Sequence, residues 1–123
     1  MIPNIYPLLN VPGVRAVAPD GVANVRLYSF GEAPADTPMP YGVWQFPSGT
    51  PLNQLAGVPQ VDQVRVQIDV YGQTPAQSRQ LALAVRNALE PSAHCFLYMD
   101  MGRDPDTDAC RITASFDLWA TRP

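Results

Sequence analysis

Residues 61–71 constrain the fold more than any other part of the chain, because apolar and polar side chains alternate there strictly. Branched apolar residues alternate with polar ones, namely Val64, Val66, Ile68 and Val70 with Arg65, Gln67, Asp69 and Tyr71. Successive side chains of a β-strand point to opposite faces, so a period of two places each set on one face. The pattern predicts a strand with one buried face.

An amphipathic helix is predicted directly after this strand. Gly72 ends the strand, Thr74 is placed to cap free backbone N–H groups, and Pro75 takes the first helical position. Apolar residues then recur on one stripe as far as Glu90, before Pro91 stops the helix; they are Leu81, Val85, Ala88 and Leu89. The neighbouring alanines favour a helix that lies flat on one face of a sheet.

The C-terminal part predicts a β-hairpin. Residues 94–101 and 110–119 are β-like, and the polar segment 102–108 joins them. In the second strand apolar side chains again alternate with mostly polar ones, the apolar set being Ile112, Ala114, Phe116 and Leu118. We expect one buried and one polar face here as well.

The N-terminal half is less regular. A short helix broken at Pro12 and Gly13 is predicted over residues 5–17, a turn over 18–21 and a short strand over 25–30. A proline-rich loop over 31–40 precedes a strand over 41–46, whose Trp44 is expected to anchor a core or an interface. A second loop over 50–59 carries Leu52 and Leu55, which we expect to dock either on the protein's own sheet or on a neighbouring subunit.

These elements define an α+β fold. It has a mainly antiparallel sheet, one long helix packed on a face and a short broken N-terminal helix, all in a single domain over residues 1–123. Pro3 and Pro7 interrupt the N-terminal apolar run, and no stretch approaches the ~20 apolar residues of a membrane span. We therefore expect no signal peptide and no membrane contact.

The charge pattern argues against a protein that reads DNA. All eight basic residues are arginines scattered along the chain, against eleven acidic residues, whereas phosphate binding normally needs a clustered basic face. Only 15% of the residues are charged, well below the usual quarter. Such a surface suits packing against other subunits, although a monomer rich in Pro, Gln, Thr and Ser would show the same composition.

The sequence carries no recognisable catalytic or cofactor motif. His94 and Cys95 are adjacent on a predicted strand and therefore point to opposite faces, which is poor geometry for a nucleophile pair. Cys95 and Cys110 have no Cys-x-x-Cys spacing and are expected to be free thiols. Asp104, Asp106 and Asp108 open like a calcium loop, but the glycine and the glutamate of that pattern are missing. We expect a solvated hairpin tip, no metal site, no cofactor and no enzymatic activity.

The order of these elements, together with several short blocks, resembles the tail-completion family of long-tailed phages, the small tail-terminator proteins. The blocks are residues 5–9, 40–45 and 66–72, the helix with Leu81 and Val85, and the hairpin with Arg111 and Asp117. The sequence departs from the family pattern at Gly42, where a branched strand residue is expected, and in its proline-rich 31–40 loop. Gly42 suggests a bulge or a close backbone contact.

The resemblance implies a structural virion protein, assembled in the host cytoplasm, at the head-proximal end of the tail. Its members are expected to form a ring, as a hexamer, that stacks on the last ring of tail-tube protein and offers a surface to the head connector, a stopper or adaptor protein. DNA would only pass through the lumen. Two alternatives stay open: another neck protein such as an adaptor or stopper ring, or a small cofactor-free α+β enzyme or ligand-binding domain.

Ring assembly needs head-to-tail interfaces, in which one patch of each subunit meets a different patch of the next. We expect those interfaces on the polar side of the 61–71 strand, on the two loops and at the hairpin tip. The candidate interface residues are Arg65, Asp69, Tyr71, Leu52, Leu55, Asp104 and Asp106.

Overall fold

A five-stranded sheet organises the fold. The structure, a computed structural model, describes residues 5–46, 61–106 and 108–121. In the strand order β3-β4-β5-β7-β6, the strands are β3 (Leu27–Ser29), β4 (Tyr41–Gln45), β5 (Val61–Gly72), β7 (Cys110–Thr121) and β6 (Ala93–Arg103). Neighbouring strands are antiparallel except β3 and β4, which run parallel. The predicted α+β fold with a mainly antiparallel sheet is confirmed.

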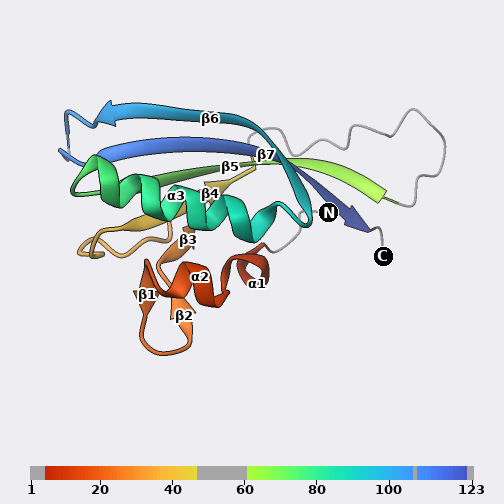
Figure 1. The fold of residues 1–123 in the computed structure, drawn as a ribbon, viewed down its shortest axis with the longest axis horizontal. Helices are drawn as coiled ribbons and strands as arrows, with labels where there is room; N and C mark the ends of the chain where they lie inside the picture. The colour runs from red at the N-terminus through yellow and green to blue at the C-terminus, as the bar shows by residue number, and fades with distance from the viewer. Residues whose placement is uncertain (1–4, 47–60, 107, 122–123) are drawn as a thin grey trace.

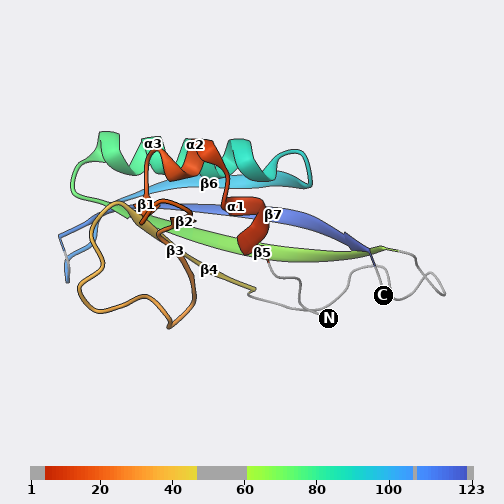
Figure 2. The same ribbon diagram turned by 90° about the horizontal axis from the view of Figure 1, so that it is seen from below.

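Helices cover one face of this sheet. The long helix α3 (Pro75–Leu89) lies along β5 and β7, and the short helices α1 (Tyr6–Leu9) and α2 (Pro12–Arg15) lie beside it (Figures 1 and 2). The core between the layers contains Val66 and Ile68 of β5, Phe116 of β7, and Leu81 and Leu89 of α3, all fully buried. Trp44 belongs to the same core, so it anchors the fold rather than an exposed surface.

The ends of α3 agree with the sequence. The Thr74 hydroxyl accepts a hydrogen bond from the backbone N–H of Gln77 (3.2 Å), and Pro75 starts the helix. The Gln77 side chain accepts in turn from the backbone N–H of Gln73 (2.7 Å). The first of these bonds satisfies a free donor of the helix start, as in a capping box, whereas the second binds the residue just before the cap. The helix ends at Leu89, as the proline at position 91 predicts.

The N-terminal segment differs from prediction in its details. The helix is broken as expected, but the break lies at Asn10 and Val11, and Pro12 begins the second helix. This is the position that tolerates proline best, because its missing N–H needs no partner there. The segment predicted as a turn contains a short strand, β1 (Pro19–Asp20), which pairs with β2 (Asn24–Val25). The actual turn begins at Gly21, whose φ of 72° suits glycine.

Gly42 is explained by a close approach between strands. A Cβ atom at this position would lie 2.6 Å from Cδ1 of Leu27 on β3 and 3.3 Å from the carbonyl oxygen of Asp69 on β5. A branched residue could not occupy that space without moving its neighbours. Of the two expectations for Gly42, the close backbone contact is confirmed, whereas the regular pairing of β4 with β5 shows no bulge there.

Candidate assembly surfaces

The face of the sheet opposite α3, here called the open face, carries a band of polar and aromatic side chains. None of the described helices lies on it (Figure 2). The band is formed by the outward residues of the three central strands: Tyr41, Val43 and Gln45 of β4, Arg65, Gln67, Asp69 and Tyr71 of β5, and Arg111, Thr113, Ser115 and Asp117 of β7. The alternation read from the sequence therefore places these residues together.

Asp69 is the centre of a hydrogen-bond network on the open face. Its carboxylate accepts from the hydroxyl of Thr113 (2.7 Å), from the guanidinium of Arg111 (3.0 Å) and from the amide of Gln67 (3.2 Å). Asp69 is only 8% exposed, although no described helix covers this face. Its neighbours shield it from water, and their donors satisfy the charge that this burial would otherwise leave unpaired.

Replacing Asp69 with alanine should lower the free energy of unfolding by about 2 kcal/mol, because buried donors then lose their acceptor. Arg111 is one-third exposed and can reach water, which limits the loss. The matched control is Asp117→Ala, which removes the partner of a half-exposed arginine on the same face and should cost less than about 1 kcal/mol. Urea unfolding of both variants measures the difference. Equal losses would show that the Asp69 network adds no more than a surface ion pair.

Tyr71 and Tyr41 stack beside this network. Their ring centroids lie 5.1 Å apart, and their planes differ by 23°. Burial raises the pKa of Tyr71 above its ordinary value; the charge of Asp69 adds to the shift, and that of Arg111 opposes it. Burial also raises the pKa of Tyr41, and the charge of Asp104 adds to that shift. The pair therefore lies within electrostatic reach of the hairpin tip.

These raised pKa values predict a loss of stability in alkali. The unfolded chain releases its tyrosine protons near pH 10, whereas the folded chain holds them to higher pH. The contribution of the two tyrosines to the free energy of unfolding is therefore complete below about pH 10, and it is lost as the pH rises through their folded-state pKa. The double variant Tyr41→Phe/Tyr71→Phe should lose less stability between about pH 8 and pH 11 in urea unfolding. If the double variant lost as much stability as the wild type over this range, the alkaline loss could not come from Tyr41 and Tyr71.

Arg65 lies on the same face but apart from this group. It pairs with Asp117 on β7 (3.4 Å), and its guanidinium lies 4.3 Å from the centre of the Phe96 ring on β6. Arg65 lies six positions before Tyr71 on β5, which corresponds to roughly 20 Å. Arg65 therefore faces the β6 edge of the sheet, whereas Tyr71 lies toward the hairpin tip.

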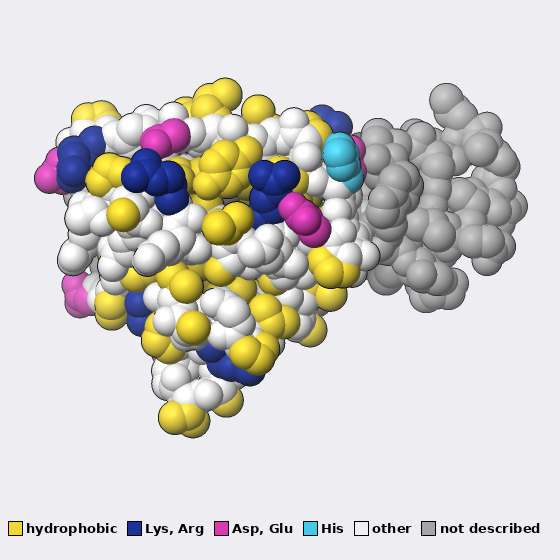
Figure 3. All heavy atoms as spheres, in the orientation of Figure 1, with side chains coloured by type: hydrophobic (Ala, Val, Ile, Leu, Met, Phe, Trp, Pro, Cys, Tyr) yellow, Lys and Arg dark blue, Asp and Glu magenta, His cyan; other side chains and the backbone are white. Residues whose placement is uncertain are grey.

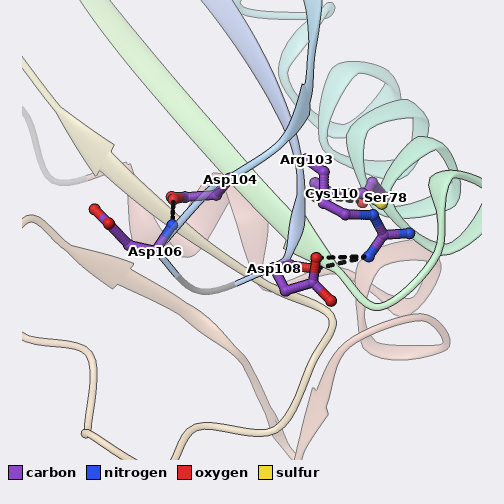
Figure 4. Close-up of polar contacts among 6 residues, drawn as sticks. All are labelled: Ser78, Arg103, Asp104, Asp106, Asp108 and Cys110. Atoms are coloured by element: carbon purple, nitrogen blue, oxygen red, sulfur yellow. Dashed lines mark hydrogen bonds and ion pairs between the residues drawn. The ribbon is translucent and has the colours of Figure 1, made fainter.

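The tip between β6 and β7 is held by its own acidic residues (Figure 4). The Asp104 carboxylate accepts from the backbone N–H of Asp106 (2.8 Å), and Arg103 donates to the carbonyl oxygen of Asp108 (2.8 Å). The Asp106 and Asp108 side chains are exposed. Nearby, the buried Ser78 hydroxyl donates to the carbonyl oxygen of Cys110 (2.6 Å) and ties α3 to β7. The described residues of the tip therefore place acidic side chains at one end of the sheet.

The candidate interface residues thus fall into two groups. The structure brings Asp69, Tyr71 and Asp104 toward one end of the open face, with Asp106 at the adjacent tip, while Arg65 lies apart. Leu52 and Leu55 lie outside the described residues. Sequence reasoning missed Thr113 as a partner of Asp69 and Phe96 as a partner of Arg65. The period of two gives the faces of β5 and β7, but only the pairing register sets Asp69 opposite Thr113.

The surface hollow between α2 and α3 offers no acid–base chemistry. Its volume is about 490 Å³, and its lining is small, apolar or amide-bearing: Gly13, Ala16, Val17, Pro40, Gln77, Gln80, Leu83, Ala84 and Asn87. His94 is exposed on β6 and lies opposite Asp117, whereas the adjacent Cys95 lies opposite Phe116 and packs against the core. Both cysteines are free, and Cys110 is buried. Among the described helices, none has the length and apolar character that crossing a membrane requires.

Comparison with known proteins gives one family. The family model described as "Tail completion protein gp17" matches residues 6–121, which include α1, α2, α3 and the whole five-stranded sheet. No curated protein matches the sequence.

Proposed function

Because the chain belongs to the tail completion protein gp17 family, and is therefore a structural protein of a bacteriophage tail, we propose that it caps the head-proximal end of the tail tube. In this role it forms a homo-oligomeric ring, a hexamer, that stacks on the last ring of tube protein and ends its growth. The other side of the ring receives the head connector. The family match over almost the whole described chain is the observation that carries this proposal.

The acidic end of the open face is suited to contact a stacked ring. Asp104 and Asp106 project at the hairpin tip, and the stacked Tyr71 lies within electrostatic reach of Asp104. Asp69 is buried and hydrogen-bonded, so its part is to hold Arg111 and the neighbouring strand in place. Asp106 is exposed and Asp104 is partly exposed, and carboxylates at the end of a hairpin favour salt bridges to basic groups of a partner protein.

Arg65 is suited to a contact within the ring. It is half exposed and stacks on Phe96 at the edge of the sheet. Leu52 and Leu55 are proposed to join the interfaces between subunits, as apolar residues of a loop. In this account the chain works by assembly and not by catalysis, and DNA only passes through the lumen.

Polymerising tail-tube protein in the presence of the purified chain tests this role. Electron microscopy should show shorter tubes, each with a ring at one end, whereas tube protein alone should give longer, uncapped tubes. A chain that ignores tubes but binds purified portal rings would instead be an adaptor, and the proposal would fail. The variant Asp106→Arg reverses an exposed tip charge and should weaken capping. Its side chain makes no described hydrogen bond or ion pair, so the fold should be unaffected.

A further inference from the structure

The outer strand β6 is an exposed sheet edge with an apolar surface. Among the described strands, β7 alone pairs with it, on one side. Phe96, Leu97, Tyr98, Met99 and Met101 are each between 39% and 49% exposed. Soluble proteins usually protect such an edge with lysine or proline, and β6 contains neither. Only two register shifts, near Phe96 and Met101, interrupt its pairing with β7. Exposed apolar patches of this kind mark sites of interaction between proteins.

Basic side chains of α3 border this edge. Arg79 makes no ion pair within the described part of the chain, and Arg86 pairs only with Glu90, one turn further along α3. Both guanidinium groups act on Tyr98 of β6, because their charges oppose the rise of its pKa that burial causes. Figure 3 shows dark blue side chains in a row over α3 and β6, with hydrophobic side chains between them and magenta acidic side chains beside some of them. The acidic residues Glu90, which pairs with Arg86, and Asp100, whose charge acts on Tyr98, belong to this region. Tyr98, Met101, Arg79 and Arg86 form what we call the β6 flank.

The opposite side of the molecule has complementary features. Asp20, Glu32 and Asp36 are exposed, and none of them forms an ion pair with a described residue. Phe30, directly after β3, is 69% exposed. Asp20 and Asp36 line a surface hollow of about 420 Å³ together with Tyr28 and Arg26. The Arg26 guanidinium donates to the carbonyl oxygens of Pro19 and Pro40, so the hollow holds two carboxylates against one arginine. Asp20, Phe30, Glu32, Asp36 and this hollow form what we call the acidic flank.

The two flanks lie at opposite edges of one sheet (Figure 1). Four strand spacings separate β3 from β6, which is roughly 19 Å. Through the successive pairings, β6 runs antiparallel to β3. If neighbouring copies are related by a rotation about an axis parallel to the strands, equivalent strands of the two copies run in the same direction. β6 of one copy would then run antiparallel to β3 of the next copy where the two edges meet. Identical subunits that meet head to tail, each through two different patches, build a ring when the rotation from one subunit to the next returns to the first subunit.

We propose that the β6 flank of one subunit binds the acidic flank of a second copy of this chain. Arg79 and Arg86 enter or border the hollow that Asp20 and Asp36 line, and Phe30 covers the apolar side chains of β6. The proposal rests on the proposed function and deepens it, since it names the two surfaces that form the lateral seam of the ring. It leaves the hairpin tip free for the stacked partner.

Paired charge reversals test the seam. In Arg79→Glu/Arg86→Glu the β6 flank becomes acidic, and in Asp20→Arg/Asp36→Arg the acidic flank becomes basic. Each variant alone then presents like charges across every seam and should stay monomeric in analytical ultracentrifugation and native mass spectrometry. An equimolar mixture should recover rings in which the two variants alternate, because both kinds of seam then join opposite charges. The wild-type chain should form rings without a partner.

The control variant is Asp106→Arg, which reverses a charge at the tip and should self-associate like the wild type. A wild-type chain that stays monomeric at every concentration tested would overturn the proposal, as would reversed variants that assemble normally alone or fail to assemble when mixed. Circular dichroism of each variant establishes that it is folded. The proposed function can fail separately. If each reversed variant alone stays monomeric and their mixture forms rings, but the wild-type rings leave tube length unchanged, the seam would be supported and the capping role rejected.

Discussion

Replacing Phe116 with alanine should lower the free energy of unfolding by about 3 to 5 kcal/mol, the largest loss expected for a single substitution in this protein. Phe116 lies on the inner strand β7, opposite Val66 of β5 and Cys95 of β6, and is fully buried. It belongs to the core that also contains Leu81, Val85 and Leu89 of α3. Its loss leaves a cavity between the two layers that the neighbouring strands and helix cannot close.

Urea unfolding at a concentration at which the chain is monomeric measures this loss, because assembly would otherwise add to the apparent stability. The control is Phe116→Leu, which keeps most of the apolar volume and should cost less than about 1.5 kcal/mol. Similar losses for the two variants would mean that the site collapses around the smaller side chain. The account of a close-packed helix–sheet core would then be wrong.

Replacing Gly72 with alanine should cost about 3 kcal/mol, because the added methyl group meets atoms that cannot move away. Its Cβ would lie 2.6 Å from Oγ and 2.7 Å from the backbone nitrogen of Ser78. Ser78 is buried in the first turns of α3, and its hydroxyl binds the carbonyl oxygen of Cys110. An alanine at position 72 would therefore push the start of the helix away from the sheet.

The matched control is Gly13→Ala in α2, where no atom lies within 4 Å of the added Cβ. That change should be neutral or stabilise by up to about 1 kcal/mol, since alanine favours a helix more than glycine does. A second variant, Gly72→Ala/Ser78→Ala, removes the hydroxyl but not the backbone nitrogen and should remain destabilised. A Gly72→Ala protein as stable as the control would contradict the described packing of α3 on β5.

Elements with a strong period or a clear cap could be predicted from the sequence. The residues of β5 from Val64 to Val70 alternate because one face is buried, and Thr74 with Pro75 defines where α3 begins. Both signals arise from local geometry, which a single sequence carries. The second strand of the hairpin was predicted for the same reason. Gly42 stood out differently, as a departure from the family pattern that suggested a bulge or a close backbone contact, and the structure shows the close contact.

Features that depend on long-range pairing could not be predicted in this way. The pairing of β3 with β4 is parallel, and β1 and β2 are two-residue strands, too short to show a period. Thr113 and Ser115 are buried although they lie on the polar face. Their burial follows from the side chains of neighbouring strands, and the sequence does not give the strand order. The β6 flank and the acidic flank depend on the same strand order, so the sequence alone could not predict them.

Electron microscopy of a phage lysate in which this gene is disrupted tests the central claim most directly. The measured quantities are the length of the tails and the fraction of tails joined to heads. The capping role predicts overlong or unjoined tails beside filled heads, and a plasmid copy of the gene should restore normal tails. Normal, infectious virions from the disrupted phage would contradict the account.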